Sequence, residues 1–283
     1  FDIKRPISSI FFGGGTPSLI SPAGIEWLLE SIDRQITISA GAEITLEANP
    51  GSFQADAPGL WRQAGINRVS LGVQSFSDSL LQRIGRIHDS HQAIKAIESC
   101  RHHYDRINID MMFGLPNQSI MDIAHDLGWL MEFDSGHISW YQLTLEPDTP
   151  FGLCPPNLPD EDELERHLRL IRNTLNTAGY RNYEISAWAR DDHFCGHNLN
   201  YWQFGDYLGI GNGAHGKLTT TKGIFRTVQN NHLETDGPLE PKEVISEFLI
   251  NALRLELGFS EDLFIERTGQ PLSVINKPIS NAC

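Results

Sequence analysis

The sequence has few cysteines, and none of them has the spacing of a metal site. Its four cysteines, Cys100, Cys154, Cys195 and Cys283, are widely separated, and no two form a CxxC pair. This pattern argues against a disulfide framework and against a metal centre built on a short cysteine motif. We therefore expect reduced thiols, as in a cytoplasmic protein.

The sequence also lacks a long apolar run and an excess of basic residues. No apolar stretch approaches the roughly 18 residues that a membrane-spanning helix needs. Lysine and arginine number 22 against 36 aspartates and glutamates, which gives a formal charge of −14. Such a balance argues against a broad nucleic-acid surface, so we expect no nucleic-acid partner. With 40% hydrophobic residues over 283 positions, the chain is long enough to fold as one large domain or two smaller ones.

Short β-prone runs alternate with longer helical patterns along the first two thirds of the sequence. This alternation predicts an α/β fold with parallel strands joined by crossover helices. The pattern alone leaves an open doubly wound sheet and a barrel as alternatives. The expected strands are Ile7–Phe12, Ile44–Ala48, Arg68–Val73, Arg106–Met112, Ile138–Leu145 and Tyr183–Trp188, and the expected helices are one beginning at Ser21-Pro22 and Ala55–Ala64, Ser77–Ile84, Ser90–His103, Ser119–Glu132 and Asp160–Ala178.

The sequence changes character after Trp188. Residues 189–235 are rich in glycine, asparagine, aspartate and aromatics, which predicts long loops with short strands. Residues 241–257, "PKEVISEFLINALRLEL", form an amphipathic pattern that predicts one more helix.

The first expected strand ends in a run of glycines. In "SIFFGGGTPSLI" the apolar Ile10–Phe12 is followed at once by Gly13, Gly14, Gly15, Thr16 and Pro17. Three consecutive glycines cost backbone entropy and give nothing to pack. They indicate either a flexible turn or a place where a ligand comes close to the backbone.

Polar residues recur at the same end of the expected strands, where parallel α/β folds bind ligands. Glu47 and Asp110 could pair with an ammonium group or bind a ribose diol, and Gln74 could bind hydroxyls. Arg86 could clamp a carboxylate, or it could be a solvated arginine at a helix end. The repetition indicates a binding site at the mouth of the sheet. The polar residues at these ends are Glu47, Asn49, Gln74, Ser75, Asp110, Gln142, Thr144 and Glu146.

Five ordered stretches resemble the radical S-adenosylmethionine (SAM) proteins related to oxygen-independent coproporphyrinogen III oxidase. They are "FFGGGTPSLI", "LEANPGSF", "GINRVSLGVQSFSDSLLQRIGRIHD", "NIDMMFGLP" and "NYWQFGDYLGIGNGAHG". The resemblance implies a partial (β/α)6 barrel followed by a small C-terminal region. We expect a barrel over residues 1–188, a loop-rich region over 189–235 and the start of a helical region over 236–283.

The resemblance also implies where the cofactor lies. Gly13, Gly14, Gly15 and Thr16 would line the methionine end of S-adenosylmethionine, and Glu47 would contact it. Further parts of that site would be held by Gln74, Arg86 and Asp110, and Thr144 would lie where the oxidase binds a second cofactor molecule.

One family motif is absent from this sequence. The family holds a [4Fe–4S] cluster with CxxxCxxC, upstream of the GGGTP strand and after an earlier barrel strand, and the four cysteines here do not match it. We therefore expect a sequence that lacks the first barrel strand, and a C-terminal region cut short near "PLSVINKPISNAC". Without these ligands we expect no reductive cleavage of the cofactor, and an uncovered sheet edge would reduce solubility.

The stretch "CGHNLNYWQFGDYLGIGNGAHG" separates two branches of the family. Its HNxxYW pattern resembles the haem-chaperone branch and not the oxidase branch. His197 is then the candidate haem-iron ligand, with Tyr201 and Trp202 packed on the porphyrin face. A structural histidine capping a loop is the alternative. His215 and Cys195 are further candidate ligands.

Three functions follow from these readings. The first is a chaperone that binds haem, delivers it to a membrane or respiratory acceptor protein, and could form a homodimer. The second is an oxidase of coproporphyrinogen III, and the third is an inactive remnant that binds the cofactor. Other polar groups have simpler readings: the acidic run Asp160–Glu165 favours a helix start, and solvated or core positions are expected for His88, His91, His102 and His103.

Overall fold

The computed structural model describes residues 5–190, 193–230 and 232–275. Its contacts divide the chain into two compact units, the first ending at Phe194 and the second beginning at Cys195. Within the described residues, no helix is both long and apolar enough to cross a membrane. The expected division into three segments, 1–188, 189–235 and 236–283, stays a prediction.

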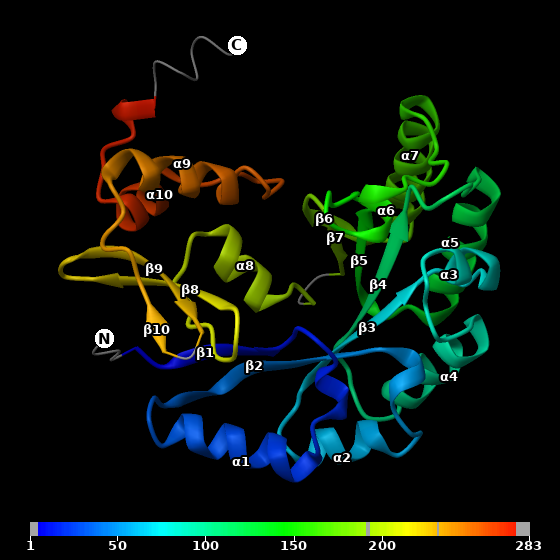
Figure 1. Cartoon of the computed structure of the whole chain (residues 1–283), viewed down its shortest axis with the longest axis horizontal. Coiled ribbons are helices and arrows are strands. Elements are labelled where there is room, and N and C mark those ends of the chain that lie inside the picture. The colour runs from blue at the N-terminus through cyan, green and yellow to red at the C-terminus, as the bar shows by residue number, and fades with distance from the viewer. Residues whose placement is uncertain (1–4, 191–192, 231, 276–283) are drawn as a thin grey trace. The chain divides into compact units, whose positions relative to one another are not determined.

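The first unit is built on a seven-stranded sheet with the order β1-β2-β3-β4-β5-β7-β6. Neighbouring strands from β1 to β5 are parallel. Figure 1 shows this part of the sheet curved, with helices along one side of it. The expected α/β fold with a partial barrel is confirmed. The parallel strands are β1 (Ile7–Phe12), β2 (Ile38–Ala48), β3 (Arg68–Gln74), β4 (Ile107–Phe113) and β5 (Gly136–Gln142), and the helices are α1 (Pro22–Asp33), α2 (Ala57–Gln63), α3 (Asp78–Arg83), α4 (Ser90–Arg101), α5 (Ile120–Phe133), α6 (Pro150–Leu153) and α7 (Glu161–Thr177), with 3-10 turns at Pro17–Leu19 and Pro50–Ser52.

The sixth expected strand differs from the prediction. Instead of one parallel strand over Tyr183–Trp188, the chain forms a hairpin of β6 (Arg181–Glu184) and β7 (Ala187–Ala189). Strand β7 pairs antiparallel with β5, so the parallel part of the sheet ends there. The turn between them falls on Ile185 and Ser186, and one serine without glycine, proline, asparagine or aspartate is too weak a turn signal to predict the reversal.

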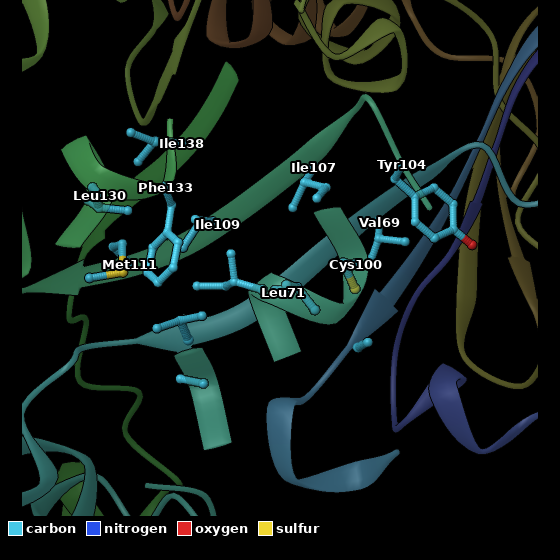
Figure 2. Close-up of a cluster of buried hydrophobic side chains, with 14 of the residues drawn as sticks. Val69, Leu71, Cys100, Tyr104, Ile107, Ile109, Met111, Leu130, Phe133 and Ile138 are labelled. Carbon is cyan, nitrogen blue, oxygen red and sulfur yellow. The ribbon is translucent and has the colours of Figure 1, made fainter. Parts of the chain in front are cut away.

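The sheet has one apolar face and one polar face, because successive side chains of a strand point to opposite sides. Along β4, Ile107, Ile109 and Met111 face the helices, whereas Asn108 and Asp110 alternate with them. Figure 2 shows the apolar side chains packed between the strands and helices α4 and α5. The polar face is the one that carries the candidate site. The core side chains labelled in Figure 2 are Val69, Leu71, Cys100, Tyr104, Ile107, Ile109, Met111, Leu130, Phe133 and Ile138.

Local signals fix the helix ends where the sequence indicated them. The backbone N–H of Gly24 donates to Oγ of Ser21 at 3.1 Å, and Pro22 occupies the first position of α1. Gly65 follows α2 with φ at 106°, a left-handed conformation that favours glycine after a helix.

The second unit packs helices against a three-stranded antiparallel sheet of order β10-β9-β8. It is more regular than the loops expected over 189–235, because residues 196–202 form a helix and β8 and β9 make a seven-residue hairpin. The helix expected over 241–257 ends at Ala252. A separate apolar core includes Phe204, Phe248 and Phe264. The elements are α8 (Gly196–Trp202), β8 (Ala214–Thr220), β9 (Gly223–Gln229), β10 (Leu233–Glu234), α9 (Pro241–Ala252) and α10 (Glu261–Thr268).

Candidate functional site

The glycine run after β1 forms an open backbone surface beside β2. Gly14 and Gly15 have φ values of 74° and 54°, and no atom lies within 4 Å of where a Cβ would stand on either. The backbone N–H of Gly14 donates to Oε2 of Glu47 at 3.3 Å. Gly13 is tighter, since a Cβ there would stand 3.3 Å from the same carboxylate oxygen. The run is therefore a shaped turn, with bare backbone at its outer positions.

Glu47 and Asp110 place two carboxylates on the polar face of the sheet. Burial raises the pKa of Glu47, the nearby charge of Asp110 raises it further, and the Gly14 N–H opposes both effects. Burial also raises the pKa of Asp110, against hydrogen bonds from Ser70 at 2.9 Å and Asn108 at 2.7 Å. Two partly buried carboxylates close enough to repel each other favour a positively charged ligand.

Gln74 ends β3 beside these carboxylates. Its Oε1 accepts a hydrogen bond from the hydroxyl of Tyr141 at 2.9 Å. Burial raises the pKa of Tyr141, and the charges of Asp110 and Glu47 raise it further, whereas the hydrogen bond to Gln74 and the charge of Arg86 lower it. Gln74, Tyr141, Asp110 and Glu47 therefore share one electrostatic environment on the polar face of β2 to β5, which the charge of Arg86 also reaches.

A buried hydrogen-bond network supports Asp110 from behind. Nδ2 of Asn108 donates to Asp110 and to Ser70. The oxygen Oδ1 of the same amide can only accept, and it accepts from Nδ1 of His137 at 2.6 Å. Nε2 of His137 then accepts from the hydroxyl of Tyr183 at 2.9 Å. Burial, followed by the charges of two arginines, lowers the pKa of His137 well below its ordinary value, so the ring is neutral.

The sequence interpretation missed these supporting residues. Ser70, Asn108, His137 and Tyr141 all stand on the polar face, at alternate positions of strands whose other face is apolar. In the sequence these residues are marked by their position, since polar residues alternate with apolar ones along these strands. Comparing the strands with one another would have revealed this pattern.

Two other expected cofactor residues lie at the margin of this group. Thr16 precedes the 3-10 turn Pro17–Leu19, and its carbonyl accepts from Leu19 N–H at 3.1 Å. Thr144 is exposed and lies beyond the end of β5, and among the described residues it makes no hydrogen bond to either carboxylate. The structure therefore brings together Gly13, Gly14, Gly15, Glu47, Gln74, Asp110 and, by its charge, Arg86.

The second candidate site is in the other unit, on α8. His197 and Tyr201 stand one turn apart, with ring centroids separated by 5.3 Å. Tyr201 stacks on Tyr207 at 4.2 Å, and Trp202 lies under the guanidinium of Arg254 at 4.2 Å. His197, Tyr201 and Trp202 are all half-buried, which places an imidazole beside a partly exposed aromatic surface.

The other two candidate haem ligands are placed differently. His215 is exposed on β8, opposite Val228 of β9. Cys195 is almost completely buried directly before α8. An exposed imidazole can reach a ligand from solvent, whereas the thiol of Cys195 is covered, which leaves His215 the stronger alternative to His197.

The described cysteines do not form a cluster site. Cys100 lies in the apolar core, where burial raises the pKa of its thiol to about 12, and Cys154 is exposed on another part of the unit. Across the described ranges no group of three or more histidine, cysteine or acidic side chains is arranged to hold a metal ion. Cys283 lies outside the described residues.

Comparison with known proteins finds relatives over most of the chain. Residues 1–130 match the model of the radical SAM superfamily. The chain is 43% identical to the heme chaperone HemW of Escherichia coli over 98% of this chain and 76% of that protein. It is 31% identical to the heme chaperone HemW of Bacillus subtilis over 94% of this chain and 74% of that protein.

A solved structure shows the same fold. Coproporphyrinogen III oxidase (HemN) from Escherichia coli, a radical SAM enzyme, superposes with a TM-score of 0.78. The match covers 98% of this chain and 72% of that one, at 19% identity. At that identity the likeness supports the architecture alone.

Proposed function

This chain belongs to the HemW family within the radical SAM superfamily, and from that premise we propose that it is a haem-binding chaperone that passes haem to an acceptor protein. The observation that carries the proposal is the arrangement on α8, where a half-buried imidazole stands beside stacked aromatic rings. Imidazole nitrogen binds haem iron, and aromatic faces pack against a porphyrin.

His197 is the proposed iron ligand. Tyr201 stands one helical turn further on and is held in place by its stack on Tyr207. The hydroxyl of Tyr207 accepts from Arg226 at 2.7 Å, and Arg226 is paired with Glu247 of α9. The aromatic surface beside His197 is thus fixed by the surrounding elements rather than free to rotate, which favours binding a flat, rigid ligand.

Haem titration followed by the Soret absorbance tests this proposal. We expect a saturable shift for the unchanged chain and a loss of affinity of about tenfold or more in His197→Ala. His125→Ala, which alters a half-exposed histidine of the other unit, is the matched control and should bind as the unchanged chain does. No saturable shift from a folded chain contradicts the proposal, and loss in His215→Ala alone moves the ligand to that residue.

Delivery is tested separately from binding. A chaperone must release haem, so mixing the loaded chain with apomyoglobin should produce the holomyoglobin spectrum. Retention of all the haem would contradict the transfer part of the proposal. The resemblance implies a membrane or respiratory protein as the natural acceptor. Formation of decarboxylated porphyrin from coproporphyrinogen III by the same preparation would instead favour an oxidase.

We also propose that the polar face of the first unit binds S-adenosylmethionine. The cofactor carries an ammonium and a sulfonium, which suit the paired carboxylates Glu47 and Asp110, and hydroxyls that suit the amide of Gln74. The bare backbone at Gly14 and Gly15 leaves room for its aminoacyl end. When bound, the cofactor supplies the sulfonium centre of the superfamily's chemistry.

The [4Fe–4S] cluster does not fit the described cysteines. Cys100 is held in the core with a raised pKa, and the described residues contain no grouping of ligands for a metal. We therefore assign no step of the proposed function to a cluster.

A further inference from the structure

Gln74 has a backbone conformation that residues other than glycine seldom adopt. Its φ is 71°, at the irregular end of β3 where the pairing with β4 shifts. A left-handed conformation is strained for a residue with a Cβ, so it persists only where its surroundings hold it. The side chain is almost completely buried, which means that neighbouring groups determine where it points.

His88 holds the residue that precedes Gln74. Its Nε2 lies 3.1 Å from the carbonyl oxygen of Val73. Because a carbonyl only accepts, Nε2 carries the proton, and burial lowers the pKa of His88 so that the ring stays neutral. His88 is two residues from Arg86, so this bond ties the Arg86 segment to the end of β3.

Asp126 of α5 holds the residues that follow Gln74. Its Oδ1 accepts from the N–H of Phe76 at 2.7 Å, and the hydroxyl of Ser75 donates to both carboxylate oxygens at 3.1 and 3.0 Å. The carboxyl group is fully buried. Oγ of Ser75 in turn accepts from the N–H of Ser77 at 3.1 Å. A carboxylate in the interior thus organises three successive residues of the loop.

The aromatic ring of Phe76 adds an apolar anchor to the same helix. It packs 6.0 Å from Trp129 and 5.9 Å from Phe133, measured between ring centroids. Both partners belong to α5, as does Asp126. The strand end is therefore fastened to α5 by polar and apolar contacts together.

We propose that His88 and Asp126 are positioning residues that hold Gln74 in its left-handed conformation and so direct its amide toward the cofactor. The inference rests on the proposed S-adenosylmethionine site. The bond from Tyr141 occupies Oε1 of Gln74 and leaves the two amide N–H donors for a ligand. His88 bonds Val73 before Gln74, and Asp126 bonds Phe76 after it. His88 and Asp126 themselves come from different parts of the unit, so Gln74 is held from two sides.

The test compares truncating and conservative substitutions at both positions. His88→Leu and Asp126→Ala remove the bonds, whereas His88→Gln keeps an N–H donor and Asp126→Asn keeps an oxygen for Phe76. His91→Leu, on the exposed start of α4, is the matched control. The readouts are the dissociation constant for S-adenosylmethionine, the melting temperature, and hydrogen exchange of the amides of residues 75–77.

We expect the truncating variants to weaken cofactor binding about tenfold and to speed exchange at Ser75 and Phe76, because each loses hydrogen bonds to the strand end. The conservative variants should stay within about threefold of the unchanged chain. Should a truncation fail to fold, Ser75→Ala provides the smaller change, since it removes one donor to Asp126 and leaves the carboxylate in place.

The outcomes separate this inference from the proposed cofactor site. Gln74→Ala should weaken binding directly. If it does so while folded His88→Leu and Asp126→Ala bind normally, the positioning roles are wrong. If the unchanged chain does not bind the cofactor, the proposed site is wrong, and exchange at residues 75–77 alone decides whether His88 and Asp126 hold the strand end.

Discussion

Nζ of Lys217 lies 2.8 Å from Oδ1 of Asp206 in the second unit, with the lysine almost completely buried. The ammonium also stands 4.2 Å from the ring centroid of Phe204. Burial raises the pKa of Asp206, but hydrogen bonds and charge from Lys217, with further bonds from Thr219, hold it at about 2. The pair therefore exists as an ion pair at neutral pH, inside a unit that has its own core.

Removing the lysine should destabilise the second unit. Lys217→Met leaves Asp206 partly buried without its counter-charge, and breaking a buried pair in this way costs about 3–5 kcal/mol. Lys222→Met, in the exposed turn between β8 and β9, is the control and should stay within about 0.5 kcal/mol. Urea denaturation measures both, and equal stability of the two variants would show that the pair contributes nothing.

Trp61 and Trp27 allow a buried and an exposed tryptophan to be compared for their contribution to stability. Trp61 of α2 is 1% exposed and meets Phe53 edge to face, whereas Trp27 of α1 is 62% exposed. We expect Trp61→Ala to lower the free energy of unfolding by about 3–5 kcal/mol. Trp27→Ala should change it by about 0.5 kcal/mol or less. Similar losses in both variants would contradict the placement of the core.

Two glycine-to-alanine substitutions should act in opposite directions. Gly14 has φ at 74°, so Gly14→Ala imposes a strain of roughly 1–2 kcal/mol even though the space beside it is open. Gly128 lies on the exposed side of α5 with nothing near its Cβ position, and alanine there should stabilise the helix by about 0.5–1 kcal/mol. Thermal melts of the two variants check the signs.

Asp110 should contribute to cofactor affinity through its charge. Asp110→Asn keeps the shape of the side chain but removes one of two carboxylates that face the proposed ammonium or sulfonium. We expect the dissociation constant for S-adenosylmethionine to rise about tenfold. Glu98→Gln, on the exposed face of α4, supplies the control, and calorimetric titration supplies the measurement. An unchanged constant would argue that the cofactor does not contact Asp110.

Asp126 should make stability depend on pH. Burial is the main cause that raises its pKa from 3.8 to about 7, opposed by the bonds from Phe76 and Ser75, with Asp122 raising it slightly. His125 is also near, its Nδ1 standing 3.9 Å from Oδ1 of Asp126. Between these two pKa values the folded chain binds a proton that the unfolded chain has released. This contribution to stability is therefore complete at low pH and is lost as the pH rises toward 7.

The Asp126→Asn variant isolates that effect. The stability of this variant should not fall as the pH rises toward 7. The free energy of unfolding of the variant minus that of the unchanged chain should therefore grow between pH 5 and 7, by at most about 1.4 kcal/mol per pH unit. Urea titrations at several pH values measure the difference, with exposed Asp105→Asn as the control. A constant difference across the range would mean that Asp126 is ionised throughout.

The bounds of a strand in the first unit could be predicted where an apolar run ended in a residue that breaks strands. Ile7–Phe12 has the predicted bounds, because an apolar run ends there in glycine. Strand β2 begins six residues before the prediction, since "ISAGA" is rich in small residues with weak strand preference. The β6–β7 hairpin was missed because Ser186 alone is a weak turn signal and Ile185 is none.

The candidate cofactor site could be predicted only in part. Glu47, Gln74 and Asp110 were found because each is polar and stands at the end of an apolar strand. Asp126 could not be found in this way, since an aspartate within an amphipathic helix is usually solvated. Its burial depends on Ser75 and Phe76, which are about fifty positions away in the chain. His88 was expected to be solvated or in the core, and the structure places it in the core.

The order of strands in the sheet affects how the protein can be assembled during synthesis. From β1 to β5 the spatial order is the order in which the ribosome makes them. Each new strand can therefore pair with one that is already complete, and no strand has to wait for a partner made much later. Only the last edge reverses this rule, because β6 lies outside β7 and joins the sheet through a neighbour that is synthesised after it.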